Sequence, residues 1–248
     1  MVIEICFELK SEKVESLPVI DHPYMILSKK GVKLQRYKDI MTGIDAFDNL
    51  VKEYDQWFDE HPVWFESEVK ALEKVIPQGK FGLEIGIGSA RFAEKLFIDR
   101  GLDPSEKMVE IARKRGIKTK VGKAESMPFE DNRFDYAVMV TVDCFLEDIP
   151  KAFQEVRRVL KSGGEFINGM IDKDSPLGQT YEKKKVDNPF YKHATFHSPD
   201  EITALLKEAG FGEFEYWQTL ITASETEVEV PRKGYGEGGF VVIKAHIV

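Results

Sequence analysis

Two glycines and two acids stand at the ends of two neighbouring predicted strands. The segment Glu84–Gly88 reads EIGIG after a short apolar run, and Asp103 closes the next predicted strand. Glycines let a ligand approach the backbone with no Cβ in the way, and an acid at the end of the second strand can accept both ribose hydroxyls of an adenosine. Asp103 could instead cap the helix predicted to follow it. The pattern favours a nucleoside-binding turn and leaves the capping role open.

The residues around the glycines discriminate between two adenosine ligands. A dinucleotide site uses a third glycine in the pattern GxGxxG, and Arg91 stands at that position. Glu84 would face a pyrophosphate with like charge, whereas it would attract the ammonium group of a methionine moiety. The predicted ligand is therefore S-adenosylmethionine, and an NAD-dependent oxidoreductase is the weaker alternative.

The segment 82–91 resembles motif I of the class I S-adenosylmethionine-dependent methyltransferases, and the resemblance continues downstream. Similar motifs occupy residues 101–112, 122–129, 134–137, 153–164 and 196–211, so the match covers about residues 78–247. Two positions depart from the family pattern, because Ala90 replaces a glycine and Lys123 replaces an Asp of the adenine segment. The resemblance implies methyl transfer from S-adenosylmethionine.

The resemblance also implies which residues bind the cofactor. Residues 47–58 are similar to the N-terminal cover of small-molecule methyltransferases related to the ubiquinone and menaquinone biosynthesis group, where a matching tyrosine lies over the methionine end of the cofactor. Tyr54 could equally be an ordinary aromatic residue of an amphipathic helix. The expected cofactor-binding residues are Tyr54, Glu84, Gly86, Gly88, Asp103, Pro104, Ala124, Glu125 and Thr141.

The sequence is less specific about catalysis and the acceptor. Methyl transfer from a sulfonium is an in-line displacement that needs no metal ion, and the five histidines show no ligand spacing. A base is needed only where the acceptor arrives protonated. The candidates are Asp143, Tyr181 and His193, although residues of these types in such positions are more often surface or packing residues than bases. No [DN]PP[YF] motif follows the predicted fourth strand, so a small-molecule acceptor is expected, with the methylated atom left open between N, O, C and S.

Changes in hydrophobic period divide the chain into three regions. Residues 1–43 predict a β-rich appendage, 44–76 a helical cover, and 77–248 an α/β core with a polar insertion at 172–195 as its lid or substrate loop. The core predicts a doubly wound, Rossmann-like sheet of seven strands with the last strand antiparallel. These strands are expected at 81–85, 97–102, 118–121, 134–140, 165–170, 213–220 and 239–247.

The composition excludes several classes of protein. The 248 residues include 35 Lys+Arg and 43 Asp+Glu, and this net charge of −8 argues against a nucleic-acid partner. Two cysteines, no signal peptide and no apolar stretch long enough for a membrane span favour a soluble, cytoplasmic protein. Residues 1–43 could form a homodimer interface, and a non-catalytic cofactor-binding sensor or partner-binding protein remains the alternative to an enzyme.

The negative charge is concentrated in the predicted helical cover. Residues 44–74 hold nine acids and three lysines. The acids could form a solvated helix face, or they could attract a positively charged sulfonium to the cleft beneath them.

Overall fold

The computed structural model describes residues 43–248, so the predicted appendage 1–43 lies outside this part of the chain except for Gly43. Three helices come first, α2 (Gly43–Asn49), α3 (Val51–Glu60) and α4 (Pro62–Glu73). Strands and helices then follow in the order β1 (Gly82–Ile85), α5 (Arg91–Leu96), β2 (Arg100–Asp103), α6 (Glu106–Lys114), β3 (Lys118–Val121), β4 (Phe134–Val140), η2 (Asp143–Phe145), α7 (Ile149–Val159), β5 (Leu160–Ile171), α8 (Pro176–Lys184), η3 (Lys185–Asp187), α9 (Pro199–Glu208), β6 (Phe211–Thr219), β7 (Arg232–Lys233) and β8 (Phe240–Ile247).

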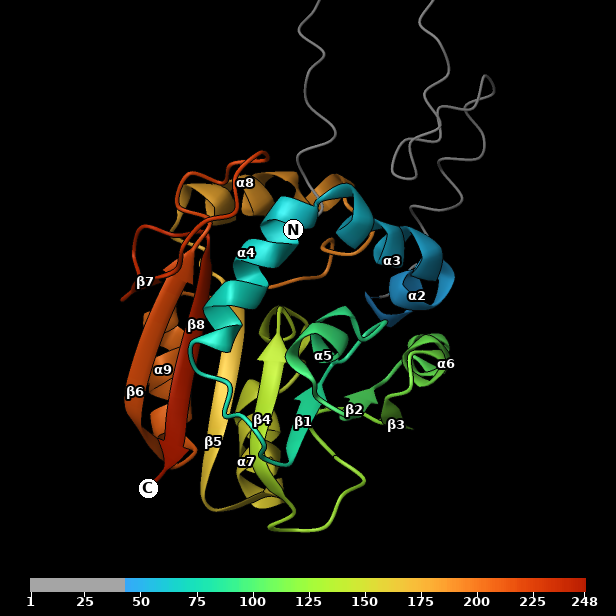
Figure 1. Cartoon of the computed structure of the whole chain (residues 1–248), viewed down its shortest axis with the longest axis vertical. Helices are drawn as coiled ribbons and strands as arrows, with labels where there is room; N and C mark the ends of the chain where they lie inside the picture. Colours follow the sequence, from blue (N-terminus) through green and yellow to red (C-terminus); the bar gives the residue numbers. More distant parts are fainter. Residues whose placement is uncertain (1–42) are drawn as a thin grey trace, which may run out of the picture.

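The strands form one twisted sheet in the order β3-β2-β1-β4-β5-β8-β6-β7 (Figure 1). The first five are parallel, and β8 is antiparallel to both β5 and β6. This confirms the predicted doubly wound sheet with an antiparallel last strand. The two-residue β7, which pairs with β6, raises the number of strands from seven to eight. The strand order reverses at β1, and ligands bind at such switch points beyond the carboxyl ends of the strands.

The predicted strand boundaries hold for β3 and β4, shift by one or two residues for β1, β6 and β8, and shift furthest for β2 and β5. β2 begins at Arg100 rather than at Phe97, because Phe97 ends α5 in a left-handed conformation (φ 57°) with its side chain 89% exposed. β5 begins at Leu160 rather than at Glu165, because α7 ends at Val159 and passes directly into the strand. Gly163 has φ 69° inside β5.

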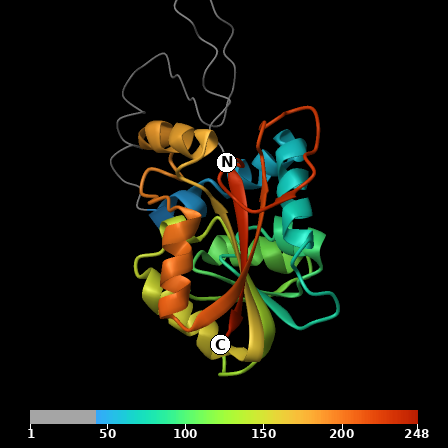
Figure 2. The ribbon, with the colours of Figure 1, turned by 90° about the vertical axis from the view of Figure 1, so that its left-hand side faces the viewer.

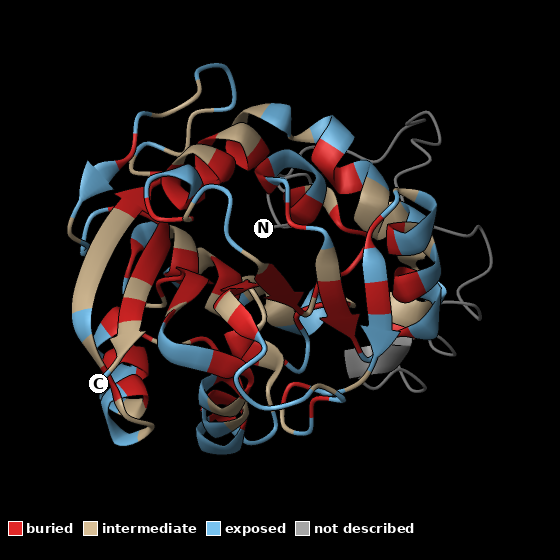
Figure 3. Cartoon of the chain, turned by 60° about the horizontal axis from the view of Figure 1, so that its bottom comes forward, coloured by how far each residue is buried: buried red, intermediate tan, exposed pale blue. Residues whose placement is uncertain are grey.

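Helices cover both faces of the sheet. Figure 2 shows α9 and α4 on opposite sides of the strands. α7 illustrates the pattern that places them there, since its buried residues recur at three- and four-residue steps and include Ala152, Phe153 and Val156. The central strands are buried, while the outer faces of the helices carry the exposed residues (Figure 3). Within residues 43–248, none of the helices combines the length and apolar character that crossing a membrane requires.

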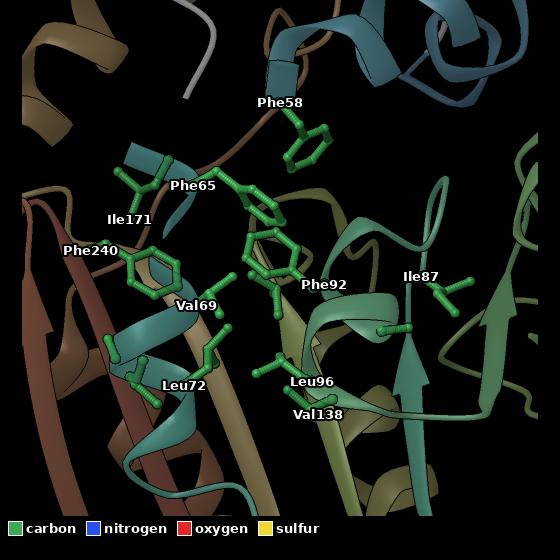
Figure 4. Close-up of a cluster of buried hydrophobic side chains, with 14 of the residues drawn as sticks. Phe58, Phe65, Val69, Leu72, Ile87, Phe92, Leu96, Val138, Ile171 and Phe240 are labelled. Carbon is green, nitrogen blue, oxygen red and sulfur yellow. The ribbon is translucent and has the colours of Figure 1, made fainter. Parts of the chain in front are cut away.

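An aromatic cluster attaches the cover helices to the core. The rings of Phe58 from α3, Phe65 from α4 and Phe92 from α5 meet edge to face, with centroids 5.0 to 5.9 Å apart (Figure 4). Edge-to-face pairs of buried rings stabilise beyond their burial alone. On the same face, Val69 and Leu72 of α4 belong to the hydrophobic cluster that includes strand residues of β4, β5 and β8. The cover is therefore part of the hydrophobic core.

An acid on α3 joins the cover to two further helices. The Asp55 carboxylate accepts hydrogen bonds from Arg91 Nε at 2.9 Å and from Arg115 Nη2 at 2.8 Å. Burial alone would raise the pKa of Asp55, but the bonds from Arg115 and Arg91 outweigh it and hold the pKa at about 2. Arg91 also pairs with Asp59 at 2.9 Å. Arg91, which stands at the position of the third glycine in the dinucleotide pattern, thus attaches α3 to α5.

Replacing Asp55 by Asn removes the charge that both arginines share. We expect the Asp55→Asn variant to lose about 1–2 kcal/mol of unfolding free energy, because charge-assisted bonds between partly buried groups contribute more than exposed pairs. Asp59→Asn is the matched control, since the Asp59 side chain is 66% exposed and solvent screens its pair with Arg91. Urea unfolding measures both variants, and a loss for Asp59→Asn as large as that for Asp55→Asn would contradict a special role for Asp55.

Candidate functional site

A cavity of about 560 Å³ lies at the carboxyl edge of the sheet, next to the point where the strand order reverses. Its walls come from the turn after β1, the end of β2, the segment after β3, the segment after β4, the helices α2 and α3, and residues 190–195. Segments that are far apart in the sequence therefore meet around one hollow. A cavity of this size can hold a small molecule.

The glycine turn forms the floor of the cavity. Gly86 and Gly88 have φ angles of 70° and 53°, a conformation that favours glycine. A Cβ on Gly86 would lie 2.3 Å from Val142 Cγ2, and one on Gly88 would lie 3.0 Å from the Tyr54 hydroxyl oxygen. The backbone N–H groups of Gly86 and Ile87 both donate to the carbonyl of Leu102. These hydrogen bonds hold the turn against β2, and the close contacts of Val142 and Tyr54 favour glycine at both positions.

Asp103 is fixed by the backbone on both sides of it. Its Oδ2 accepts the Gly88 N–H at 2.8 Å, and its Oδ1 accepts the Ser105 N–H at 2.9 Å. Burial raises the pKa of Asp103 to about 6, although these two N–H groups oppose the shift. Asp103 does not cap the following helix, because Ser105 is the N-cap of α6 and its Oγ accepts the Met108 N–H. The Asp103 carboxylate instead lines the cavity.

Tyr54 forms part of the cavity wall above the glycine turn. Burial raises its pKa, and the nearby carboxyl groups of Asp103 and Glu84 raise it further, so the side chain stays a neutral phenol. Its ring meets that of Phe58 edge to face, with centroids 5.5 Å apart. Tyr54 thus belongs both to the cavity wall and to the packing of the amphipathic helix α3.

Glu84 is part of β1, two residues before Gly86, and does not line the cavity. It is 2% exposed, and its Oε2 has no hydrogen-bond partner within residues 43–248. Burial raises the pKa of Glu84 well above its usual value, and Asp103 adds to the shift. Pro104, Ala124, Glu125 and Thr141 do line the cavity, so the structure gathers eight of the nine sequence-predicted cofactor residues on its wall.

The three candidate bases lie in different places. His193 lines the cavity, whereas Asp143 and Tyr181 do not. Asp143 is 3% exposed, and burial raises its pKa to about 7 while the Asn168 side chain opposes that shift. Tyr181 is fully buried and packs edge to face on Tyr191, with ring centroids 5.3 Å apart. A side chain can act on a bound molecule only within reach of it, so His193 is the candidate that the geometry favours.

Two contacts near the site were not predicted from the sequence. Phe145 of η2 lines the cavity, and its ring lies 5.3 Å from that of Phe47 on α2. Ser105 Oγ donates to Asp48 of α2 at 2.5 Å, which joins the cover to the start of α6. The position of Phe145 in the segment that follows the fourth strand was a usable signal, because the carboxyl ends of parallel strands meet at one edge of the sheet. The Asp48 contact has no local signal in the sequence.

A parallel sheet that reverses at β1, with a glycine turn after β1 and an acid after β2, defines a nucleoside-binding α/β protein. Comparisons with known proteins narrow the class. Residues 83–168 match the family described as a methyltransferase domain. An uncharacterised protein of Methanocaldococcus jannaschii is 47% identical, over 82% of this chain and 98% of its own length.

Two further relatives carry described activities. A crystal structure from Thermotoga maritima, described as an S-adenosylmethionine-dependent methyltransferase and possible histamine N-methyltransferase, is 44% identical, covers 82% of this chain and 99% of that chain, and superposes with a TM-score of 0.80. A demethylmenaquinone methyltransferase of Staphylococcus carnosus is 26% identical, over 72% of this chain and 84% of its own length. The chain belongs to the class I S-adenosylmethionine-dependent methyltransferases, and S-adenosylmethionine is its cofactor.

The residues at the cavity fit this cofactor. A carboxylate oxygen has two lone pairs, so each Asp103 oxygen can accept a ribose hydroxyl in addition to its backbone N–H. A Cβ on Gly86 would collide with Val142, so this position of the floor favours glycine. A glycine lets a ligand approach the backbone closely. A nearby ammonium group would compensate the buried Glu84 carboxyl, whose Oε2 has no hydrogen-bond partner among residues 43–248.

Replacing Gly86 by Ala tests how tightly the floor is packed. Gly79 is the matched control, because it also has φ 70° but a Cβ there would meet nothing within 4 Å. We expect Gly79→Ala to lose about 1–2 kcal/mol of unfolding free energy from backbone strain alone. Gly86→Ala should lose about 1–3 kcal/mol more, because its Cβ collides with Val142. Urea unfolding compares the two variants, and equal losses would show that Val142 can move aside.

Proposed function

We propose that the protein transfers the methyl group of S-adenosylmethionine to a small-molecule acceptor by in-line displacement, without a metal ion. The observation that carries the proposal is the Asp103 carboxylate, which lines the same cavity as the glycine turn and is fixed to it by the Gly88 N–H. An adenosine site needs an acid that accepts the ribose hydroxyls and a stretch of backbone that a ligand can approach. Here the hydrogen bond from the Gly88 N–H to Asp103 joins the two.

The proposed contacts run along the cavity from one wall to the other. Asp103 accepts the ribose hydroxyls, and Pro104, Ala124 and Glu125 enclose the adenine. The methionine end lies over Gly86 and Gly88, with Tyr54 above it. Glu84, two residues before Gly86, compensates the ammonium group. Thr141, directly after β4, borders the position of the reactive methyl group.

The cofactor supplies an activated methyl group, and the protein supplies position. Reactants held in line need no strong catalytic group, because orientation alone provides effective molarities on the order of 10⁵–10⁸ M. The rings of Tyr54 and Phe47, 5.7 Å apart, enclose the cavity from the side of the cover helices and help to exclude water. His193 can accept a proton where the acceptor arrives protonated.

A small molecule is the acceptor class that the surroundings favour. The cavity is bounded by α2, α3 and the loop before α9, and it has a volume suited to a small ligand. Histamine and demethylmenaquinone, named in the descriptions of two relatives, are both small organic molecules. The net charge of −8 is unfavourable for a polyanionic acceptor. We further propose that residues 44–76 act as a cover, 77–248 as the catalytic core and 172–195 as its substrate loop.

Calorimetric titration of the full-length protein with S-adenosylmethionine and S-adenosylhomocysteine tests the proposal. We expect both to bind, and the Asp103→Asn variant to bind at least tenfold more weakly, because an amide has one carbonyl oxygen to offer the two ribose hydroxyls. Circular dichroism checks that the variant is folded. Absence of binding of either ligand to the wild-type protein would disprove the proposed function.

The pH dependence of binding provides a second test. The pKa of Asp103 is raised to about 6, so as the pH falls below about 6 the free protein takes up a proton that must leave before the carboxylate can accept both hydroxyls. Affinity for S-adenosylhomocysteine should therefore be insensitive to this group above pH 6 and fall up to tenfold for each pH unit below it. The measurement is titration between pH 5 and pH 8.

The Asp103→Asn variant is the control for this dependence. It removes the titrating carboxyl at the cavity but keeps Asp143, whose pKa of about 7 belongs to a side chain outside the cavity wall. The fall in affinity below pH 6 should disappear in the variant. A fall that persists unchanged would assign the dependence to another group.

A further inference from the structure

One end of the cavity is built from aromatic rings. Phe47 of α2, Tyr54 of α3, Phe145 of η2, and Phe190 and Tyr191 of the loop before α9 all line it. We call these five residues the aromatic box. Neighbouring rings of the box have centroids 5.2 to 6.0 Å apart. The rings come from four separate segments, so the fold brings them together around one space.

The proposed cofactor contacts leave most of the aromatic box unused. The adenosine contacts lie on the segments after β2 and β3, whereas Phe145, Phe190 and Tyr191 follow β4 or precede α9. Tyr54 is the residue that the two parts share, because it lies directly above Gly88. The box is therefore on the side of the methionine end, where an acceptor must approach the methyl group.

The charges around the cavity are unfavourable for an anionic acceptor. Three carboxylates line the wall, on Asp103, Glu125 and Glu147. Lys123 is the one lysine or arginine on that wall among residues 43–248, and it is paired with Glu147 at 3.2 Å. A site for a carboxylate or phosphate would need an arginine or an uncompensated lysine. Aromatic faces instead attract cations, through the negative potential above each ring.

We infer that the aromatic box binds the acceptor as an amine, so that the atom methylated is nitrogen. The inference rests on the proposed function and specifies its acceptor. The amine reacts as its neutral form, and the nitrogen lone pair forms the new N–CH₃ bond. The S–CH₃ bond breaks with its electron pair left on sulfur, which becomes a neutral thioether. The positive charge passes from sulfur to nitrogen, and one proton of the resulting ammonium, where it carries one, leaves to water or His193.

This charge balance explains why an aromatic box suits the reaction. With an amine acceptor the site holds one positive charge before and after transfer, and the ring faces stabilise that charge wherever it lies between sulfur and nitrogen. With a phenolate or carboxylate acceptor the two charges would cancel, and the anion would first have to enter a cavity lined by three carboxylates. The structure therefore favours nitrogen over an anionic oxygen.

A pair of isosteric probes tests the inference without turnover. Choline and 3,3-dimethylbutan-1-ol have the same shape, but the first carries a quaternary nitrogen where the second has carbon. We expect choline to bind the full-length protein, saturated with S-adenosylhomocysteine, at least tenfold more tightly than the neutral alcohol, because only the cation gains from the ring faces. Calorimetric titration measures both. The anion 3,3-dimethylbutanoate should show no binding.

Variants of the box assign the effect to its rings. Phe190→Leu should weaken choline binding several-fold, while Phe190→Tyr, which keeps the ring face, should preserve it. Phe145→Leu and Phe145→Tyr form a second pair, in case loss of the fully packed Phe190 ring disturbs the loop. The affinity for S-adenosylhomocysteine should change less than that for choline in each leucine variant.

The outcomes separate this inference from the proposed function. Equal binding of choline and the neutral alcohol would overturn the amine assignment and indicate a box for uncharged rings. Binding of S-adenosylhomocysteine with no binding of choline would also overturn it, while the proposed function would stand. Failure of S-adenosylhomocysteine itself to bind would overturn both.

Discussion

The site depends on the hydrogen bonds of one buried carboxylate. Asp103 ends β2, and its two oxygens accept the N–H groups of Gly88 and Ser105. The first bond fixes the turn after β1, and the second fixes the start of α6. Charge-assisted bonds of this kind, made in a buried site, are stronger than bonds between neutral groups. The same residue that can bind a ribose therefore also holds the floor of the cavity in place.

The cover helices are fastened to this corner by acids. Asp48 of α2 accepts the hydroxyl of Ser105, which is also the cap of α6, and Asp55 of α3 accepts from Arg91 and Arg115 on the helices behind the glycine turn. Phe58 adds apolar contact to Phe92 of α5. The cover and the nucleoside corner are thus one packed unit, and the position of Tyr54 over Gly88 follows from these attachments.

Short-range patterns in the sequence predict the strands and the residues at their ends. They do not predict the direction in which a side chain points, because that direction depends on tertiary contacts. The strand over 134–140 matches because its apolar run has clear ends, and Asp103 lines the cavity because strand ends share one edge of the sheet. Asp143, just after β4, fails to reach the cavity because its side chain points into the interior of the fold, where it is 3% exposed. No sequence spacing distinguishes that direction from the one that Cys144 takes into the cavity wall.

The acidic cover shows how structure changes the meaning of a charge count. Nine acids over residues 44–74 suggest a field that attracts a sulfonium, but several of them are locally compensated. Asp55 and Asp59 pair with arginines, and Glu66 pairs with Lys95. Compensated pairs contribute little field beyond a Debye length of about 8 Å in physiological salt. The paired acids of the cover therefore act as attachments, and the carboxylates and ring faces that line the cavity are the groups placed to select a cationic ligand.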